Sequence, residues 1–306
     1  MHRRKFIATT AAASALLTLP GQSLLAGKKA SPKLCFSTLG CPEWSFAQIL
    51  DFAAAHHYQG IEIRGIQKEM DLPKSPVFAT AAAISNAKAA CAEKKIPIVG
   101  LGSSCELHHP DTAKRNQHLD NGKRFIDLAA ALGGVNVRVF PNSFVPGEEK
   151  QVTINRIVEG LQTLAAHARG TGVNVLLETH GQLVWTADLL RIMQQVPDAQ
   201  VGLIWDFYNM WTVTKEPPAA VYAQLKPYIR HTHLKDSLKK DGQENYVLFG
   251  KGEGPAAEAV KALKNGGYWG YYSFEWEKLW HPEIAEPDLA IGAFPAAFMS
   301  MWQSKR

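Results

Sequence analysis

Short apolar runs alternate with longer helical patterns along most of this 306-residue chain. Eight of these runs are rich in β-branched or aromatic residues, as buried strands are. They cover residues 33–39, 60–64, 96–102, 135–140, 173–178, 201–206, 229–235 and 271–275. Amphipathic helical patterns follow them at 46–57, 78–94, 116–132, 153–170, 186–195, 218–227, 256–265 and 287–303.

Eight strands in strict alternation with eight helices predict an α/β fold, a single (β/α)8 TIM barrel over residues 33–303. The chain length suits either one large barrel or two ordinary domains. A doubly wound open sheet is the alternative architecture, but no Gly-rich phosphate loop follows the first strand. The polar stretch 236–255 is expected to form an elaborated loop after the seventh strand.

The first 27 residues have the pattern of an export signal. They combine a basic start, a short apolar middle and a small-residue end. The pair Arg3 and Arg4, followed by Phe6, resembles the twin-arginine type, and an ordinary secretory signal is the alternative. We therefore expect a periplasmic protein without a membrane anchor after signal cleavage.

Charge and cysteine usage exclude several classes of protein. The formal net charge is +5, and without the three cations of the leader, 30 Lys and Arg stand against 28 Asp and Glu. No basic run favours nucleic acid, and no later apolar stretch is long enough to span a membrane. The cysteines lack the CxxC spacing of a zinc knuckle, although an exported protein can form disulfides. Disulfides and buried free thiols are both open for Cys35, Cys41, Cys91 and Cys105.

Polar side chains gather where the predicted strands end. In a barrel of this kind the catalytic face lies at the C-terminal ends of the strands. The fifth to eighth strands each bring one oxygen or imidazole ligand to this face: Glu178, Asp206, His233 and Glu275. Three carboxylates and one imidazole suit a divalent cation such as Mn²⁺, Mg²⁺ or Co²⁺. For any single acid, a helix cap or a surface ion pair is the alternative.

Further candidates for contacts with a substrate lie on the same strands and loops. His231 and His233 face the same way because strand side chains alternate, and only one of them is expected to be a ligand. An ion pair between Arg138 and Glu62 is the alternative to substrate binding by these two residues. The candidates for binding substrate oxygens are Glu62, Arg138, His180, His231 and Lys235.

Loop residues add weaker candidates. Trp44, Trp185 and Trp211 lie in predicted loops at the catalytic face, where sugars stack on such rings, and ordinary packing is the alternative. His108 and His109 follow the third strand and are candidates for a second metal site.

Six stretches, taken in their order and spacing, resemble the sugar phosphate isomerase/epimerase superfamily with its xylose isomerase-like TIM barrel. They are "GIEIR" (60–64), "LLETHG" (176–181), "IWDFYN" (204–209), "HTHLKD" (231–236), "GKGEGP" (250–255) and "GYWGYYSFEWE" (267–277). The resemblance covers nearly all of residues 33–303. It implies a divalent metal, foremost manganese with magnesium, cobalt or zinc as alternatives, on the four ligands above. It also implies that His233 is the ligand of the histidine pair, and that Glu178 and Glu275 transfer protons.

The chain departs from the pattern of ketose 3-epimerases in this superfamily. Asn209 stands where those enzymes carry a histidine, and Lys239 stands where they carry an arginine. Both positions help to hold the substrate in those enzymes, so we place Asn209 among the substrate-binding candidates. The departure argues against 3-epimerisation of a free ketose, and the export signal argues against a phosphorylated substrate.

The resulting hypothesis is a sugar isomerase or epimerase that moves a proton next to a carbonyl group through an enediolate. The same enediolate can instead expel a β-substituent, which on a 3-keto-glycoside gives a lyase or hydratase. The expected partner is a small sugar or keto-sugar, and a homo-oligomer is open. A DNA-cleaving relative of endonuclease IV is disfavoured by the mild charge and the leader. A silent sugar-binding protein should lack the complete ligand set.

Overall fold

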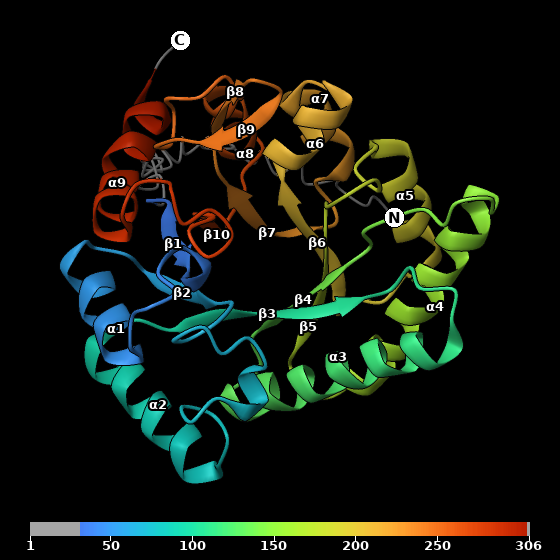
Figure 1. Cartoon of the computed structure of the whole chain (residues 1–306), viewed down its shortest axis with the longest axis horizontal. Coiled ribbons are helices and arrows are strands. Elements are labelled where there is room, and N and C mark those ends of the chain that lie inside the picture. The colour runs from blue at the N-terminus through green and yellow to red at the C-terminus, as the bar shows by residue number, and fades with distance from the viewer. Residues whose placement is uncertain (1–30, 305–306) are drawn as a thin grey trace, which may run out of the picture. The chain divides into compact units, whose positions relative to one another are not determined.

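The eight predicted strands close into one parallel barrel in the computed structural model, which describes residues 31–304 (Figure 1). Around the barrel, each strand pairs with the next in the chain, and β10 returns to pair with β1. The strands are β1 (Lys33–Ser37), β2 (Gly60–Ile63), β3 (Ile98–Glu106), β4 (Asn136–Phe140), β5 (Asn174–Glu178), β6 (Val201–Asp206), β7 (Ile229–Leu234) and β10 (Tyr271–Phe274). The predicted (β/α)8 barrel is thereby confirmed.

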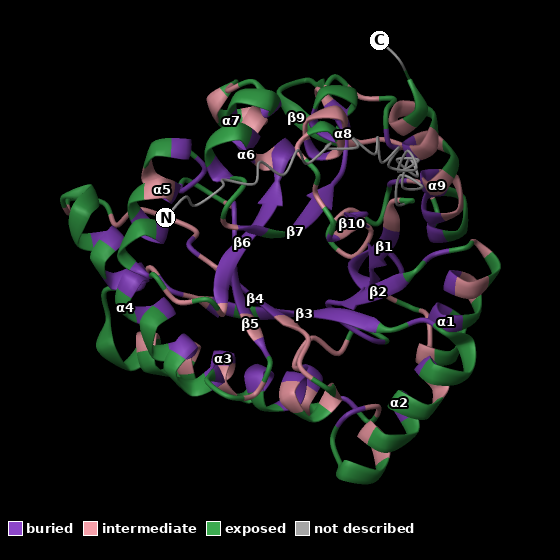
Figure 2. Cartoon of the chain, turned by 180° about the vertical axis from the view of Figure 1, so that it is seen from behind, coloured by how far each residue is buried: buried purple, intermediate pink, exposed green. Residues whose placement is uncertain are grey.

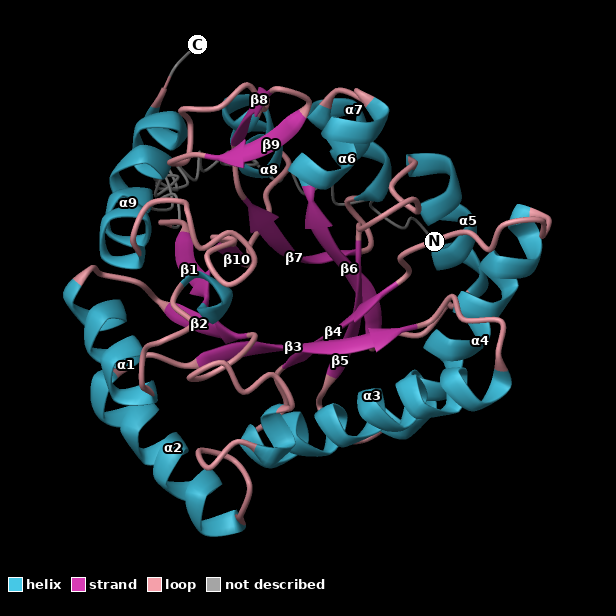
Figure 3. Cartoon of the chain, viewed as in Figure 1, coloured by secondary structure: helices cyan, strands magenta, loops and turns pink. Residues whose placement is uncertain are grey.

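Helices surround the barrel on its outside (Figure 3). They are α1 (Phe46–Ala55), α2 (Ala81–Lys94), α3 (Thr112–Leu132), α4 (Lys150–Ala168), α5 (Thr186–Gln195), α6 (Phe207–Thr214), α7 (Pro218–Leu225), α8 (Ala256–Asn265) and α9 (Pro287–Gln303). Two 3-10 turns, η1 (Thr38–Gly40) and η2 (Leu72–Lys74), follow β1 and β2. Because the helices cover the outer face, the strands are buried on both faces, as Figure 2 shows.

One helix and one hairpin were not in the sequence prediction. The unpredicted helix is α6, which begins directly after β6 because Asp206 ends the strand and also caps the helix. The polar stretch 236–255 contains an antiparallel hairpin of β8 (Ser237–Lys240) and β9 (Gln243–Tyr246). Polar, largely exposed residues form this hairpin, so a search for apolar runs could not detect it.

The barrel closes where the first and last strands meet. β10 pairs with β1 from Lys33–Tyr271 to Phe36–Phe274. Behind this seam, the ring of Phe274 stacks on Phe294 of α9 with 4.7 Å between centroids. Packed aromatic rings of this kind add to the stability that buried area alone gives.

Some of the predictions concern other parts of the chain or the cysteines. The predicted export signal at residues 1–27 lies outside the described residues. Within residues 31–304, no helix has the length and apolar character that a membrane crossing needs. All four cysteines are buried free thiols, so no disulfide links them in this structure.

The carboxylate of Asp236, just after β7, organises the glycine-rich loop 250–254. Its oxygens accept hydrogen bonds from the backbone amides of Gly250, Gly252 and Gly254 at 2.9–3.1 Å, and from that of Ser237 at 3.1 Å. A Cβ atom on Gly252 would lie 2.1 Å from Asp236 Oδ1, so the close approach requires glycine. This contact joins the stretch "HLKD" to the stretch "GKGEG".

Replacing Asp236 by alanine should therefore leave several partly buried amide donors unpaired. We expect Asp236→Ala to lower the free energy of unfolding by about 3 kcal/mol. Urea unfolding followed by circular dichroism measures this change. Asp120→Ala, at an exposed position on α3, is the control and should change stability by less than about 0.5 kcal/mol. Equal effects of the two substitutions would contradict the proposed role of the Asp236 carboxylate.

Candidate active site

The C-terminal ends of β5, β6, β7 and β10 bring four ligand-type side chains together. Glu178, Asp206, His233 and Glu275 each offer one oxygen or nitrogen atom, and these atoms all lie within 4.8 Å of one another. Every one of the four residues is at most 2% exposed. The four residues predicted to converge therefore do so, at the end of the barrel where such folds place their chemistry.

Local hydrogen bonds fix the ends of β5 and β6. The hydroxyl of Thr179 accepts from the Asp206 amide at 2.9 Å and donates to the Asp206 carbonyl at 3.0 Å. Asp206 Oδ1 accepts from the Asn209 amide at 2.9 Å and so caps α6. The second oxygen, Oδ2, is thereby directed to the cluster, where it lies 2.8 Å from Lys235 Nζ.

The glycine in "LLETHG" has a backbone reason. Gly181 has φ of +66°, and a Cβ atom there would lie 2.3 Å from the carbonyl oxygen of Asn142. The close approach lets Gln182 donate its amide to that carbonyl at 2.7 Å, while His180 Nδ1 lies 2.8 Å from Asn142 Oδ1. The loops after β4 and β5 are thus joined beside the cluster.

His233 connects two layers of the barrel interior. Its Nδ1 lies 2.8 Å from Glu178 Oε1 and 3.2 Å from Glu275 Oε1. Its Nε2 lies 3.0 Å from both carboxylate oxygens of Glu62. One ring nitrogen therefore faces the ligand cluster, and a buried carboxylate orients the other, as around ligating histidines in metal proteins.

Glu62 and His231, predicted as substrate-binding residues, lie below this cluster and contact each other. His231 Nε2 is 2.9 Å from Glu62 Oε2, which also accepts a hydrogen bond from Ser273 Oγ at 3.0 Å. Both residues are about 1% exposed. The alternative of an ion pair between Glu62 and Arg138 is not among the described contacts, because Glu62 pairs with imidazoles. Glu62 and His231 are therefore paired with neighbouring side chains, and neither of them lines the cavity described below.

Two buried cations neutralise the carboxylates. Lys235 Nζ lies 2.8 Å from Asp206, 2.7 Å from Glu275 and 2.8 Å from Glu277. On the other side, Arg138 Nη1 lies 3.1 Å from Glu178 Oε2 and 3.4 Å from Glu275 Oε1. Charges buried to this extent persist because they are paired.

The environment separates the pKa values of the carboxyl groups. Burial alone would raise the pKa of Glu178, but His233 and Arg138 outweigh it and lower that pKa. His233 and Lys235 likewise overcome burial at Glu275 and hold its pKa well below the usual value. At Asp206, burial dominates over the attraction of Lys235 and raises the pKa to about 6. Of the three carboxylates in the cluster, Glu178 and Glu275 are therefore the two that stay ionised most readily.

A cavity of about 210 Å³ opens above the cluster. Three of the predicted substrate-binding residues, Arg138, His180 and Lys235, line it together with Glu178 and Glu275. Glu62, His231 and Asn209 do not line this cavity. The cavity is below the range of about 300–1,000 Å³ typical of drug-sized ligands, so it suits a smaller molecule.

The side chain of Asn209 is turned toward the backbone. Its Nδ2 donates to the Thr179 carbonyl at 3.3 Å, next to its cap contact with Asp206. Lys239 is exposed on the β8 strand and is not part of the cavity wall. The two positions at which the sequence departs from ketose 3-epimerases are therefore not in the lining of this cavity.

Several cavity residues were not predicted as site residues. Arg64 follows β2 in the stretch "GIEIR", where its position at a strand end was a usable signal. Trp280 is 56% exposed in the loop after β10, where strand periodicity gives no guidance. The remaining wall residues that were missed are Leu39, Glu106, Phe140, Asn142 and Glu277.

The three tryptophans suggested as sugar platforms are not part of the cavity wall. Trp44 packs against Phe52 with 4.7 Å between centroids. Trp211 contacts the ring of Tyr208 and has Lys215 Nζ 3.6 Å from its ring centroid. Trp185 is 43% exposed just before α5. The packing alternative therefore describes Trp44 and Trp211.

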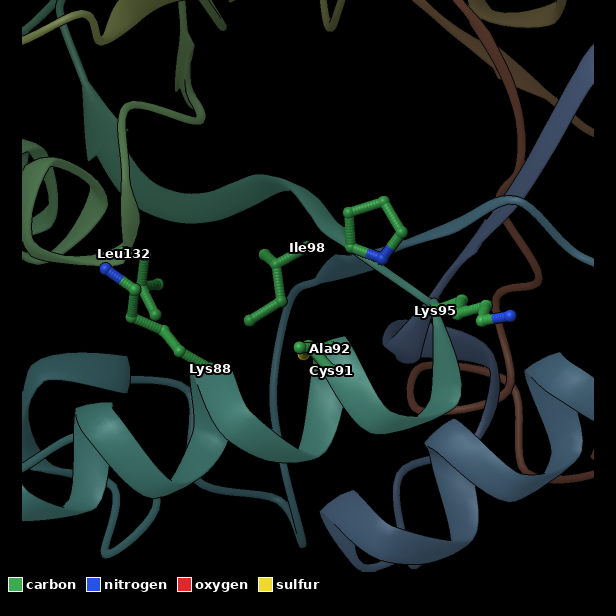
Figure 4. A pocket seen from close by; sticks show the side chains of 7 residues that line it. Lys88, Cys91, Ala92, Lys95, Ile98 and Leu132 are labelled. Carbon is green, nitrogen blue, oxygen red and sulfur yellow. The ribbon is translucent and has the colours of Figure 1, made fainter.

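A larger depression of about 390 Å³ lies elsewhere, between α2, the start of β3 and the end of α3. Figure 4 shows Lys88 and Cys91 of α2, Lys95 directly after this helix, and Ile98 and Leu132. No carboxylate or imidazole lines this depression. Despite its size, it lacks the groups that metal binding or acid–base chemistry at the barrel end would use.

The buried oxygen atoms of the cluster fit a bound divalent ion. Glu178 Oε2 and Asp206 Oδ2 accept no hydrogen bond from the described residues, although each lies near a cation. Buried polar atoms without a hydrogen bond call for an explanation, and an ion is one. Three carboxylates and one imidazole are ligands for hard to borderline cations.

Comparison with known families gives one match that spans most of the chain. A family model described as the xylose isomerase-like TIM barrel matches residues 50–292. A comparison with curated proteins gives no match.

Solved structures share the fold at low sequence identity. The IolI protein with a bound zinc atom has a TM-score of 0.74 and 20% identity, covering 88% of this chain and 98% of that one. D-psicose 3-epimerase with D-fructose has a TM-score of 0.71 and 16% identity, covering 89% and 100%. The 3-keto-D-glucoside 4-epimerase YcjR from E. coli has a TM-score of 0.70 and 17% identity, covering 88% and 100%. These similarities concern the fold.

The buried ammonium of Lys235 should be essential to the stability of the metal-free cluster. We expect Lys235→Met to lower the free energy of unfolding by about 3–5 kcal/mol, because it leaves buried carboxylates unpaired. Urea unfolding in the presence of a chelator measures this loss. Lys68→Met, which removes an exposed partner of Glu43, is the control and should cost less than about 1 kcal/mol. A loss no larger than that of the control would show that Lys235 does not stabilise the cluster.

Proposed function

Since the chain belongs to the xylose isomerase-like TIM barrel family, we propose that it is a divalent-metal-dependent sugar isomerase or epimerase. One observation carries this proposal. Two buried, ionised carboxylates, Glu178 and Glu275, face the same cavity and the same imidazole nitrogen of His233. Such a pair suits proton removal from a carbon next to a carbonyl group and proton return to that substrate.

Glu178, Asp206, His233 and Glu275 would hold the metal ion. Manganese suits this set best, with magnesium, cobalt and zinc as alternatives. When bound, the ion polarises the substrate carbonyl and stabilises the negative charge that develops on the substrate oxygens. Glu62 fixes the ring of His233 from below, and Thr179 fixes the backbone that carries Asp206.

The two glutamates would act from different sides of the cavity. Glu178 ends β5 and Glu275 follows β10, with β6 and β7 between them in the barrel. One carboxylate takes the proton from the carbon. The other, which is ionised in the resting protein, first takes up a proton from water and then delivers it to the opposite face. Arg138 contacts both carboxylates, and together with Lys235 it favours their ionised forms.

The cavity walls supply groups for a polyhydroxylated substrate. Arg64, Arg138 and Lys235 are buried cations that can donate to hydroxyl or carbonyl oxygens. Trp280 at the cavity, more than half exposed, offers a flat face to a sugar ring. The substrate class is therefore a small sugar or keto-sugar. We further propose that the protein is exported to the periplasm through the twin-arginine route.

A second function is favoured by a specific observation. Ketose 3-epimerases carry substrate-binding residues at the positions of Asn209 and Lys239. In this protein neither of these two residues lines the cavity. The alternative is a lyase or hydratase on 3-keto-glycosides, which uses the same proton abstraction and then expels the C1 aglycone. The exposed face of Trp280 would suit an aglycone.

Proton exchange should test the step that both functions share. We expect the mature protein with Mn²⁺ in D₂O to incorporate deuterium next to the carbonyl of its substrate, observed by proton NMR. Free ketoses and a 3-keto-glucoside are offered in parallel. Glu178→Gln and Glu275→Gln should each slow exchange by about 10²–10⁴-fold, whereas Glu159→Gln, exposed on α4, should have no effect.

The reaction products then decide between the isomerase/epimerase function and the lyase function. An epimeric or isomeric product supports the isomerase/epimerase function, and aglycone release without an epimer supports the lyase. No metal-dependent change with either substrate set would refute both.

Glu62 should control metal affinity without touching the substrate. Glu62→Gln removes the negative charge that orients His233 Nε2, so we expect Mn²⁺ affinity to fall by about 10–100-fold. Isothermal titration calorimetry on the chelator-treated protein measures this affinity. Glu159→Gln is again the control. Unchanged Mn²⁺ affinity in Glu62→Gln would exclude a positioning role.

A further inference from the structure

A second group of ligand-type side chains lies where β3 ends. Glu106 is the last residue of β3, and His108 and His109 follow it in the loop to α3. One ligand atom from each of the three residues lies within 4.8 Å of the other two. The imidazole rings of His108 and His109 have centroids 4.1 Å apart. The three side chains thus converge on one region.

The backbone of this loop is held from several directions. Leu107 donates its amide to the Phe140 carbonyl at 2.9 Å, which joins the loop to β4. Arg156 of α4 donates to the His108 carbonyl at 2.8 Å, and Glu148 holds the same guanidinium at 3.0 and 3.1 Å. Ligands on a fixed backbone lose little freedom on binding, which favours a specific site.

The hydrogen-bond pattern leaves nitrogen atoms available. The side chain of His109 is only 7% exposed, and its Nε2 lies 2.8 Å from Glu106 Oε2 without hydrogen-bond geometry. His108 Nδ1 is buried and has no hydrogen-bond partner among residues 31–304.

A simple ion pair explains these observations less well than a metal site does. An ion pair between Glu106 and His109 would account for one nitrogen atom but would leave His108 Nδ1 buried and unpaired. A histidine in the neutral form offers a lone pair, and neutral imidazole is the form that ligates metals. Two imidazoles and one carboxylate form the ligand set of many open zinc sites.

We propose that Glu106, His108 and His109 form a second transition-metal site, separate from the cluster of Glu178, Asp206, His233 and Glu275. Its two imidazoles favour Zn²⁺, whereas the carboxylate-rich first cluster suits harder ions. Glu106 also lines the cavity above the first cluster, so one ligand of the second site reaches that cavity, whereas His108 and His109 do not line it. Three protein ligands leave a coordination position for water or another small ligand.

Zinc stoichiometry tests this proposal without any substrate. The chelator-treated full chain is titrated with Zn²⁺, desalted, and analysed for metal by mass spectrometry. We expect two equivalents in the unchanged protein, one in His109→Gln and one in Asp206→Asn. The double variant should retain none. His167→Gln is the matched control, because His167 Nε2 pairs with Asp127 at 2.7 Å on an exposed surface outside both clusters. It should retain two equivalents.

The variants separate the two sites from each other. His108→Gln, at a less buried position, repeats the test if His109→Gln does not fold as judged by circular dichroism. An equivalent that is lost in the histidine variants but kept in Asp206→Asn supports the second site, even if the first cluster binds nothing. The proposal would be overturned if both histidine variants retained two equivalents of zinc. It would also be overturned if the unchanged protein bound a single equivalent and only Asp206→Asn lost it.

Discussion

The ion pairing around His233 is the interaction on which the rest of the barrel interior depends. One ring nitrogen faces Glu178 and Glu275, and the other faces Glu62, all fully buried. The three carboxylates raise the pKa of His233 well above its usual value although burial alone would lower it. The imidazole is therefore a positive centre in the metal-free protein. Removing water from so many charges is costly, and only near-complete pairing makes it tolerable.

The strands around this centre are tied to it by small contacts. Thr179 links the ends of β5 and β6, Gly181 allows the next loop to approach Asn142, and Asp236 holds the glycine-rich loop after β7. None of these residues contributes a ligand to the first cluster. They occur beside the ligands in the sequence because the ligands require a fixed backbone. The sequence stretches that resemble the superfamily therefore combine ligands with their supports.

Much of this architecture could be predicted because strands and helices alternate with distinct periods. The bounds of α8 and α9 match the predicted ranges, and the four residues expected at the strand ends converge. The depth of a side chain was harder to predict. A period of two places His231 and His233 on the same face, but it does not say that Glu62 and His231 lie one layer below the cavity. Trp280 was missed because it lies in the loop after β10, and Glu106 was missed because β3 continues beyond residue 102, the predicted end of the third strand.

The contacts of Lys235 bear on the order in which the protein is assembled. Its ammonium group already balances carboxylates from β6 and β10, so these strand ends can close on each other with an internal counter-charge. Small metal-dependent domains, in contrast, remain unfolded until their ion binds. With Lys235 as counter-charge, the barrel would not need an ion in order to fold. A metal ion could then be taken up by the finished barrel and selected by ligand chemistry, at whatever stage that ion becomes available.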